Sequence, residues 1–262
     1  MIEKLKKLFK NYRYYALRTF FNIPYSIALI SLVRFIYFYY IKKTFKSFYA
    51  MDSKPEEMGF QKDKQITSLQ HNTDYLKNHL KNLGRRFKQF NADRSDIPLR
   101  PLMALDFPRF INMKVLSIGP RMESELFKLV SYGFQLKNIH AIDIQSYSKL
   151  IDLGDMIKMP YRDSSFDLII IGWVLTYSNV PDKAISEVIR VAKNNCLISM
   201  CHSHVDDFEN KGYSNYHLNS SEVVLNLFKN NIGYTYFKNH PFDEGNKRNN
   251  GRSNFLIKIK KK

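Results

Sequence analysis

An alternation of strand-like and helix-like segments fills residues 112–262, and it limits the chain to one class of fold. Residues 165–175, SFDLIIIGWVL, form an apolar, β-branched run that is typical of a central strand buried on both faces. Residues 181–193, PDKAISEVIRVAK, follow with an early proline and with apolar side chains at helical spacing. Strands that alternate with helices form a mostly parallel sheet covered on both faces, so the sequence predicts a doubly wound α/β fold.

Seven strands are expected in this sheet. Ligands of such sheets bind beyond the carboxyl ends of the strands, which directs the search for a site. The connection between the second and third strands is too short for a crossover helix, so residues 146–150 predict a loop or a single turn. The predicted strands are residues 113–119, 139–145, 149–155, 165–175, 195–201, 232–238 and 254–260, and the predicted helices are residues 123–134, 181–193 and 220–231.

Residues 20–41, FFNIPYSIALISLVRFIYFYYI, form an apolar segment about as long as a membrane-spanning helix. Cations flank both ends, three tyrosines cluster near one end, and Pro24 suits the first turn of a helix. Arg34 opposes insertion, because a central arginine costs about 2.5–3.5 kcal/mol against about −3 to −5 kcal/mol from the apolar side chains. Three interpretations stay open: the segment spans a membrane, lies on its surface, or packs on the rest of the protein.

Three regions are expected along the chain. Residues 1–50 are basic and apolar, residues 51–111 form a linker and a helical extension, and residues 112–262 form the α/β domain. Within the middle region, residues 66–90 have apolar side chains at helix-like spacing and predict a helix. Residues 96–110 contain three prolines and are therefore expected to be extended.

The formal net charge of +17 is concentrated near the start, where the first 50 residues hold ten basic side chains and only Glu3 as an acid. A basic arm attracts phosphate groups on anionic lipid or on nucleic acid, although a lysine-rich chain also becomes basic without any partner. Cys196 and Cys201 lie near one predicted strand and indicate buried, reduced thiols. We therefore expect a cytoplasmic protein, with association to a membrane as an open option.

Two runs in the second half of the chain, residues 154–167 and residues 185–197, carry a resemblance to a known family. They resemble the GDA…LPF…NSFD and L.E..RVLKPGG.L patterns of class I S-adenosylmethionine-dependent methyltransferases, of the small-molecule, type 11-like kind. The resemblance covers about 150 residues, from Asn112 to Lys262, and implies a Rossmann-like seven-stranded sheet that uses S-adenosyl-L-methionine as cofactor. The matching residues are Gly154, Asp155, Met159, Pro160, Tyr161, Ser165, Phe166 and Asp167 in the first run, and Ile185, Glu187, Arg190, Val191, Lys193 and Leu197 in the second.

The resemblance also implies which residues hold the cofactor. An acidic residue that ends the second strand, here Asp143, accepts hydrogen bonds from both ribose hydroxyls, and Asp155 accepts from the adenine amino group. Trp173 either flanks the cofactor or substrate, or packs in the core. The expected cofactor-binding set is Gly119, Pro120, Arg121, Asp143, Asp155, Met156 and Trp173.

The first motif departs from the family's acidic residue followed by GxGxG. Ser117 stands at the acidic place, and Arg121 and Glu123 stand at the second and third glycine places. Glycines there let the backbone approach the ligand closely. Two interpretations stay open: Arg121 donates to the carboxylate of the methionine moiety, or Arg121 and Glu123 pair with each other and merely close the turn.

Candidate catalytic residues follow the fourth and fifth strands. Methyl transfer needs alignment of nucleophile and methyl group, and a general base only for poor nucleophiles. His202 is the first choice of base and Tyr177 the second candidate, with an ordinary loop histidine as the alternative. The spacing of His202, His204 and Asp206 is a weak metal signal without a fourth ligand, so no metal is expected.

These observations favour an S-adenosylmethionine-dependent methyltransferase that acts on a small molecule, a glycan or a lipid-linked substrate. A catalytically inactive methyltransferase fold that binds a partner is the first alternative, because the glycine motif is eroded. An RNA methyltransferase that uses the basic N-terminal part is the second, with nucleic acid as the less favoured partner.

Overall fold

The computed structural model describes residues 2–47, 90, 92–105, 112–178, 180–203, 218, 220–239 and 252–261. The predicted linker, nearly all of the helix predicted at residues 66–90, and the side chains of His204, Asp206 and His217 lie outside the described residues.

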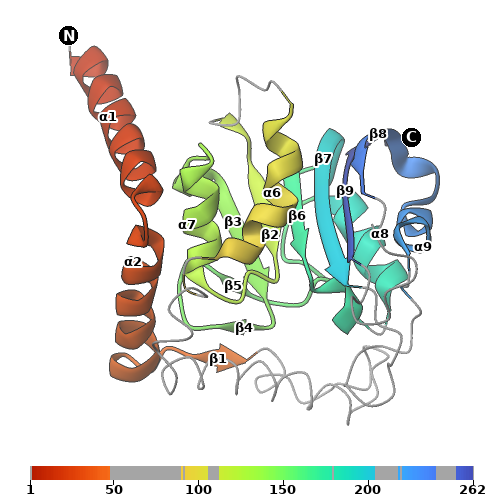
Figure 1. Cartoon of the computed structure of the whole chain (residues 1–262), viewed down its shortest axis with the longest axis horizontal. Helices are drawn as coiled ribbons and strands as arrows, with labels where there is room; N and C mark the ends of the chain where they lie inside the picture. Colours follow the sequence, from red (N-terminus) through yellow and green to blue (C-terminus); the bar gives the residue numbers. More distant parts are fainter. Residues whose placement is uncertain are drawn as a thin grey trace.

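A seven-stranded sheet forms the centre of the molecule, in the order β5-β3-β2-β6-β7-β9-β8 (Figure 1). Strand β9 runs antiparallel to both of its neighbours, while the other pairs are parallel. The predicted mostly parallel, doubly wound sheet is therefore confirmed. The strands are β2 (Val115–Ile118), β3 (Ile139–Asp143), β5 (Asp152–Leu153), β6 (Phe166–Gly172), β7 (Ala192–Ser203), β8 (Ile232–Lys238) and β9 (Arg252–Ile259).

Helices cover both faces of the sheet, as the alternating pattern predicts. Helices α6 (Asp96–Met103) and α7 (Glu123–Ser131) pack on one face, and α8 (Pro181–Val191) and α9 (Ser221–Leu227) pack on the other. Successive residues of β6 serve the two layers in turn: Leu168 and Ile170 face α6 and α7, while Ile169 and Ile171 face α8. Cys196 and Cys201 are free and buried in β7, which confirms the prediction of buried thiols.

Helix α6 corrects the expectation that residues 96–110 are extended. Pro98 lies in its first turn, where a missing N–H costs nothing, but Pro101 lies inside the helix and leaves the carbonyl of Ile97 without its intrahelical donor. The side-chain amide of Asn254 on β9 donates to that carbonyl at 2.9 Å, and Ser199 Oγ on β7 donates to the carbonyl of Pro98. The sheet therefore supplies the donor that Pro101 removes, and Ser199 adds a further bond to α6.

The N-terminal region folds as two helices that meet at a sharp bend. Helix α1 (Ile2–Asn22) and helix α2 (Ser26–Phe35) are inclined at 98°, and a π-helix, η1 (Ile36–Ile41), continues α2. Pro24 lies in the turn before α2 rather than in its first turn, and Tyr25 there has φ 63°. No single helix among the described residues is long and apolar enough to cross a membrane, although this bent pair meets the length and composition requirement.

Both N-terminal helices pack alongside α7 (Figure 1). Phe21 stacks on Phe127 of α7 with ring centroids 4.8 Å apart, and Ile27, Ala28 and Phe35 are buried on the inner side of α2. Of the three interpretations of residues 20–41, packing on the rest of the protein is the one observed for this inner side.

The connection between β3 and β5 contains no helix, as its length predicts. It forms the two-residue strand β4 (Gln145–Ser146), which pairs antiparallel with β1 (Lys46–Ser47) from the N-terminal region. Tyr147 is fully buried against Phe35 of α2, with ring centroids 5.2 Å apart. The N-terminal helices thus cover a part of the sheet that a crossover helix would otherwise cover.

Candidate cofactor site

The turn after β2 keeps the backbone of a glycine turn at its first position. Gly119 has φ 70°, and its N–H donates to the carbonyl of Ile142 at the end of β3 at 2.8 Å. A Cβ at Gly119 would overlap Val174, so both the conformation and the space require glycine. The carboxyl ends of β2, β3 and β6 therefore meet closely around this residue.

Arg121 adopts the left-handed conformation that a glycine would take at the second glycine place. Its φ is 46°, and its backbone N–H donates to Asp143 Oδ2 at 3.0 Å. Gln145 N–H donates to Asp143 Oδ1, also at 3.0 Å. Burial raises the pKa of Asp143, while these two N–H donors lower it. The turn thus fixes the carboxylate of Asp143 at the strand end where the ribose contact is expected.

Glu123, at the third glycine place, turns its side chain away from this turn. Its carboxylate is completely buried and forms a two-point ion pair with Arg34 of α2, at 2.6 and 2.7 Å. Ser148 Oγ also donates to it, and the Tyr147 hydroxyl accepts from the Glu123 backbone N–H at 3.0 Å. Glu123 raises the pKa of the Arg34 guanidinium. The partner of Glu123 is therefore Arg34 of α2, whereas the expected alternative paired Glu123 with Arg121.

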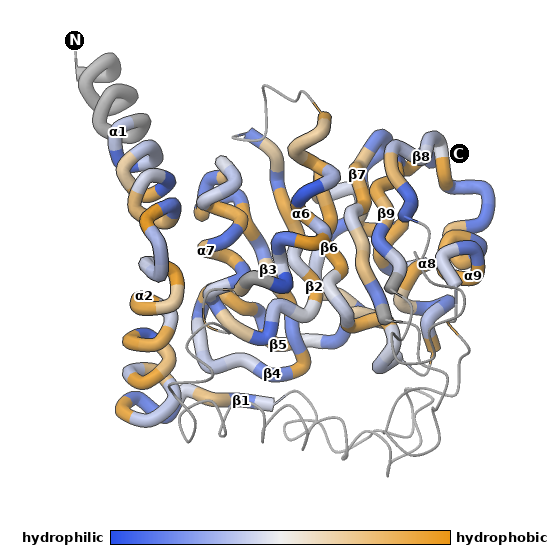
Figure 2. Tube along the Cα trace, viewed as in Figure 1, coloured by the Kyte–Doolittle hydropathy of each residue, from blue (hydrophilic) through white to orange (hydrophobic). Residues whose placement is uncertain are grey.

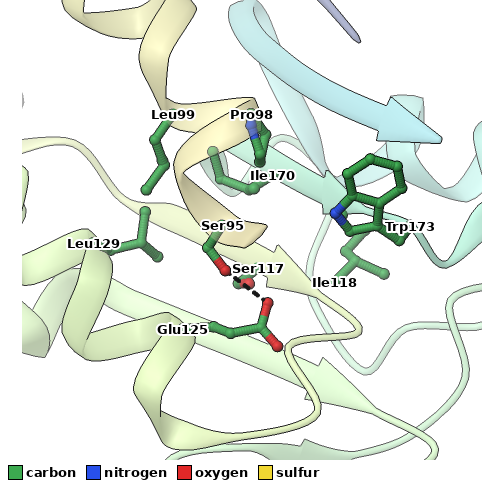
Figure 3. A pocket seen from close by; sticks show the side chains of 10 residues that line it. Ser95, Pro98, Leu99, Ser117, Ile118, Glu125, Leu129, Ile170 and Trp173 are labelled. Atoms are coloured by element: carbon green, nitrogen blue, oxygen red, sulfur yellow. Dashed lines mark hydrogen bonds between the residues drawn. The ribbon is translucent and has the colours of Figure 1, made fainter. Parts of the chain in front are cut away.

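A small pocket lies between α6, α7 and the carboxyl ends of β2 and β6 (Figure 3). Its volume is about 20 Å³, which suits one water molecule or an ammonium group. Glu125 of α7 points into it, and its carboxylate accepts from Ser95 Oγ at 2.9 Å and lies beside Ser117. Gly172 ends β6 at the pocket, and a Cβ there would meet nothing within 4 Å.

The ionisation of Glu125 in this pocket depends on burial and on two nearby arginines. Burial raises the pKa of Glu125 to about 8, against the lowering effects of Ser95, Arg121 and Arg94. The Arg94 guanidinium also lies 4.9 Å from the centre of the Trp173 ring, which lines the same pocket. Sequence reasoning missed Glu125 and Arg94. The one available signal was Ser117, which stands where the family has an acidic residue, so that a carboxylate from another position can take its place.

Asp155 and Met156 follow β5 at the same edge of the sheet. Asp155 is 4% exposed, and its Oδ1 accepts from the backbone N–H of Ile157 at 3.0 Å, so it closes a turn. The N–H of Gly154 donates to the carbonyl of Asp143 at 3.0 Å, which holds the two strand ends together. Met156 packs against the core layer of α8.

Comparisons with known proteins now bear on this geometry. Residues 124–200 match the family model described as "Methyltransferase domain". By this match, the α/β fold described above contains a methyltransferase-domain sequence that runs from α7 to β7. The resemblance seen in the sequence is thereby confirmed, and S-adenosylmethionine is the cofactor that the match supports.

A solved structure of similar fold is the Burkholderia thailandensis 1,6-didemethyltoxoflavin-N1-methyltransferase, with bound 1,6-didemethyltoxoflavin and S-adenosylhomocysteine. The identity is 8%, the TM-score 0.54, and the match covers 78% of this chain and 93% of that one. A SAM-dependent methyltransferase from Aquifex aeolicus matches with 19% identity and a TM-score of 0.44, over 66% of this chain and 96% of that one. The search of curated proteins found no match.

The second run of residues that resembles the methyltransferase pattern has a structural role. Arg190 and Glu187 form an ion pair at 2.7 Å, and both bond the backbone of Met159, Glu187 to its N–H at 2.7 Å and Arg190 to its carbonyl at 3.1 Å. Asp167 accepts from the backbone N–H of Lys114 at 2.9 Å and pairs with Lys193 at 2.8 Å. These motif residues fix the loop after Asp155 and the start of β6, so they support the site without lining it.

The two candidate catalytic residues of the methyltransferase domain have different surroundings. His202 is completely buried at the end of β7, and its Nε2 lies 2.9 Å from the carbonyl oxygen of Leu218. Tyr177 lies half-buried in the 3₁₀ turn η7 (Leu175–Tyr177) that follows β6. Their catalytic roles stay predictions. Among the described residues, no three His, Cys, Asp or Glu side chains gather closely enough to hold a metal ion.

Proposed function

We propose that this methyltransferase domain binds S-adenosyl-L-methionine between the carboxyl ends of β2, β3 and β6 and methylates a small molecule, a glycan or a lipid-linked substrate. One observation carries the proposal: the turn at Gly119 keeps its glycine backbone and fixes the carboxylate of Asp143 by a hydrogen bond from Arg121 N–H. The substitutions in the glycine motif therefore leave the turn in a conformation that can accept a nucleoside.

The residues present fit the cofactor. Asp143 keeps an acceptor lone pair on each oxygen for the ribose hydroxyls, because each oxygen receives one backbone N–H. Gly172 leaves open space beside the backbone of β6. Glu125, in its pocket, suits the ammonium group of the methionine moiety, and Arg121 suits its carboxylate. When bound, the cofactor supplies an electrophilic methyl group on a sulfonium.

The chain itself positions the reactants. Glu125 is protonated at neutral pH because burial raises its pKa to about 8, and a neighbouring ammonium group would favour its charged form. Cofactor binding should therefore release a proton from Glu125. The acceptor would enter past Tyr177, whose half-buried ring lies beyond the end of β6.

The size of the substrate is supported only by likeness. The Burkholderia enzyme of similar fold has 1,6-didemethyltoxoflavin bound, which favours a small-molecule acceptor here. The eroded glycine motif favours the alternative of a partner-binding protein without turnover.

Calorimetric titration with S-adenosylmethionine and S-adenosylhomocysteine tests the proposal. We expect binding of both, with Asp143→Asn weakening affinity by about 10–100-fold, since hydrogen bonds to a charged group contribute about 1.5–3 kcal/mol. Asp163→Asn is the matched control, because the Asp163 side chain is 75% exposed and pairs with Arg190 on the surface. An absence of binding at millimolar cofactor would overturn the proposal. Binding without formation of S-adenosylhomocysteine from any fractionated extract would favour the inactive alternative.

A further inference from the structure

The outer side of α2 and η1 is apolar although the inner side already has its packing partner. The exposed side chains are spaced by three, four or seven residues, so they form one stripe along the helix. Figure 2 shows this part of the chain as largely hydrophobic. The stripe consists of Leu29 (57% exposed), Val33 (57%), Ile36 (37%), Tyr37 (42%), Tyr40 (41%) and Ile41 (66%).

Such a stripe is unusual for a helix on a water-exposed surface. Single exposed apolar residues are ordinary, but a helix that packs one apolar face normally shows polar residues on the other. On the inner side of α2, Ile27 packs in the α7 layer, while Leu32 and Phe35 pack in a second cluster that contains Tyr147. Arg34 forms its ion pair with Glu123. The outer stripe, defined by the six residues above, is thus left without charged residues of its own.

Within residues 12–47, the segment that carries the outer stripe, all charged residues are of one sign. Between residues 12 and 47 the chain contains six basic residues and no Asp or Glu. Lys42, Lys43 and Lys46 follow the stripe directly and are exposed, and Lys42 Nζ lies 5.8 Å from the centre of the Tyr37 ring. Arg13 and Arg18 are exposed on α1. An apolar stripe with tyrosines and a cationic border is complementary to the surface of an anionic bilayer.

The bend between α1 and α2 favours the surface over the interior of a bilayer. The two helices are inclined at 98°, and the inner side of α2 is held by the sheet domain. A helix that keeps one side on a folded domain can present only its other side to lipid, which is the arrangement of an interfacial helix.

We propose that the outer stripe of α2 and η1 docks this protein on the surface of anionic lipid bilayers. The docked helix lies in the plane of the interface, with its apolar side chains among the acyl chains and Lys42, Lys43 and Lys46 at the headgroups. The surface does not depend on the proposed methyltransferase activity. Strand β1, which follows η1 along the chain, pairs with β4 directly after β3, so the docked segment is joined to the sheet domain near the carboxyl end of β3.

Vesicle sedimentation of the full chain tests this docking. The probes are vesicles of phosphatidylcholine alone and vesicles with about one third phosphatidylserine, at physiological salt. We expect binding to the anionic vesicles only. The double variant Leu29→Ser/Val33→Ser should bind at least about tenfold more weakly, because each substitution removes apolar surface, roughly half of a side chain, that the bilayer would bury. Tyr234→Ser on β8 is the matched control, because Tyr234 is also 57% exposed but lies on the far edge of the sheet.

The charge arm uses Lys42→Gln/Lys43→Gln, which should weaken binding to anionic vesicles several-fold and make it less sensitive to salt. Thermal unfolding of each variant verifies that it is folded before binding is compared. Equal recovery in the supernatant with both kinds of vesicle overturns the proposal, and so does unchanged binding of the stripe variant. Concentration-dependent dimerisation that the stripe variant abolishes, without vesicle binding, assigns the stripe to a second copy of the chain and overturns the lipid assignment.

Discussion

Replacing Arg34 by methionine should remove the ion pair that joins α2 to Glu123 beside the candidate site. The carboxylate of Glu123 is completely buried, while the Arg34 side chain is 34% exposed. Methionine keeps most of the length of arginine and its contact with Phe127, whose ring centre lies 6.0 Å from the guanidinium carbon. The variant therefore removes the cation, while Ser148 Oγ still donates to the buried Glu123 carboxylate and the Glu123 N–H still donates to the Tyr147 hydroxyl.

The magnitude follows from this geometry. Removing one partner of a buried ion pair costs about 3–5 kcal/mol, because the other charge stays buried without compensation. Water reaches part of the Arg34 guanidinium, which weakens the pair, so we expect a loss of about 2–3 kcal/mol in the free energy of unfolding. In a chain of this size such a loss lowers the melting temperature by about 5–10 °C.

Urea unfolding followed by circular dichroism measures the loss, with Glu123→Gln and the double variant completing a cycle. We expect the two substitutions to couple by about 1–3 kcal/mol. Lys238→Met is the control, because Lys238 pairs with a Glu222 side chain that is 61% exposed and should contribute under about 1 kcal/mol. The reasoning fails if Arg34→Met costs no more than this control, or if the double variant loses the sum of the single losses.

Three further predictions follow from the site and its support. Gly119→Ala should cost at least about 2 kcal/mol in unfolding free energy, because of its φ of 70° and the overlap at its Cβ. Gly172→Ala should instead leave stability within about 0.5 kcal/mol and weaken cofactor binding about tenfold; chemical unfolding measures the first effect and calorimetry the second. Glu125, whose pKa burial raises to about 8, contributes stability that is complete below about pH 4.5 and is lost as pH rises through 8, so Glu125→Gln should flatten the pH dependence of melting between those values; a parallel wild-type curve contradicts this. Asn254→Ala should cost about 1–2 kcal/mol by urea unfolding, and less in a Pro101→Ala background, where the helix regains its own donor; equal losses in both backgrounds exclude this role.

The sequence predicts the sheet well because its strands are marked by local composition. β-branched runs such as residues 166–172 indicate buried strands, and the eleven residues between Asp143 and Asp155 are too few for a crossover helix. Helix α6 escapes prediction because its missing donor comes from Asn254, more than 150 residues away along the chain. The prolines of a segment show which backbone N–H donors are missing, but not that a side chain on a distant strand replaces one of them.

The candidate site divides in the same way. The place of Asp143 at the end of β3 is predicted from the sequence, because local pattern marks the strand, and its contact with ribose stays a prediction. The partner of Glu123 is not found, because Arg34 lies 89 positions earlier, in a segment whose composition indicates contact with lipid at least as strongly as packing. The arginine that makes a membrane-spanning reading costly is the residue that ties this segment to the domain.

The short connection after β3 and the N-terminal helices form one structural unit. Without a crossover helix, Tyr147 needs a cover, and Phe35 provides it, while Thr44 Oγ1 donates to the carbonyl of Tyr147 at 2.6 Å. Strand β1 then pairs with β4 in the same connection. Deleting residues 1–50 would therefore uncover Tyr147 and leave Glu123 buried without its cation. A deleted chain that fails to bind vesicles or cofactor would report a damaged domain, so point variants on the outer stripe, which leave this inner side intact, are the experiments that separate docking from folding.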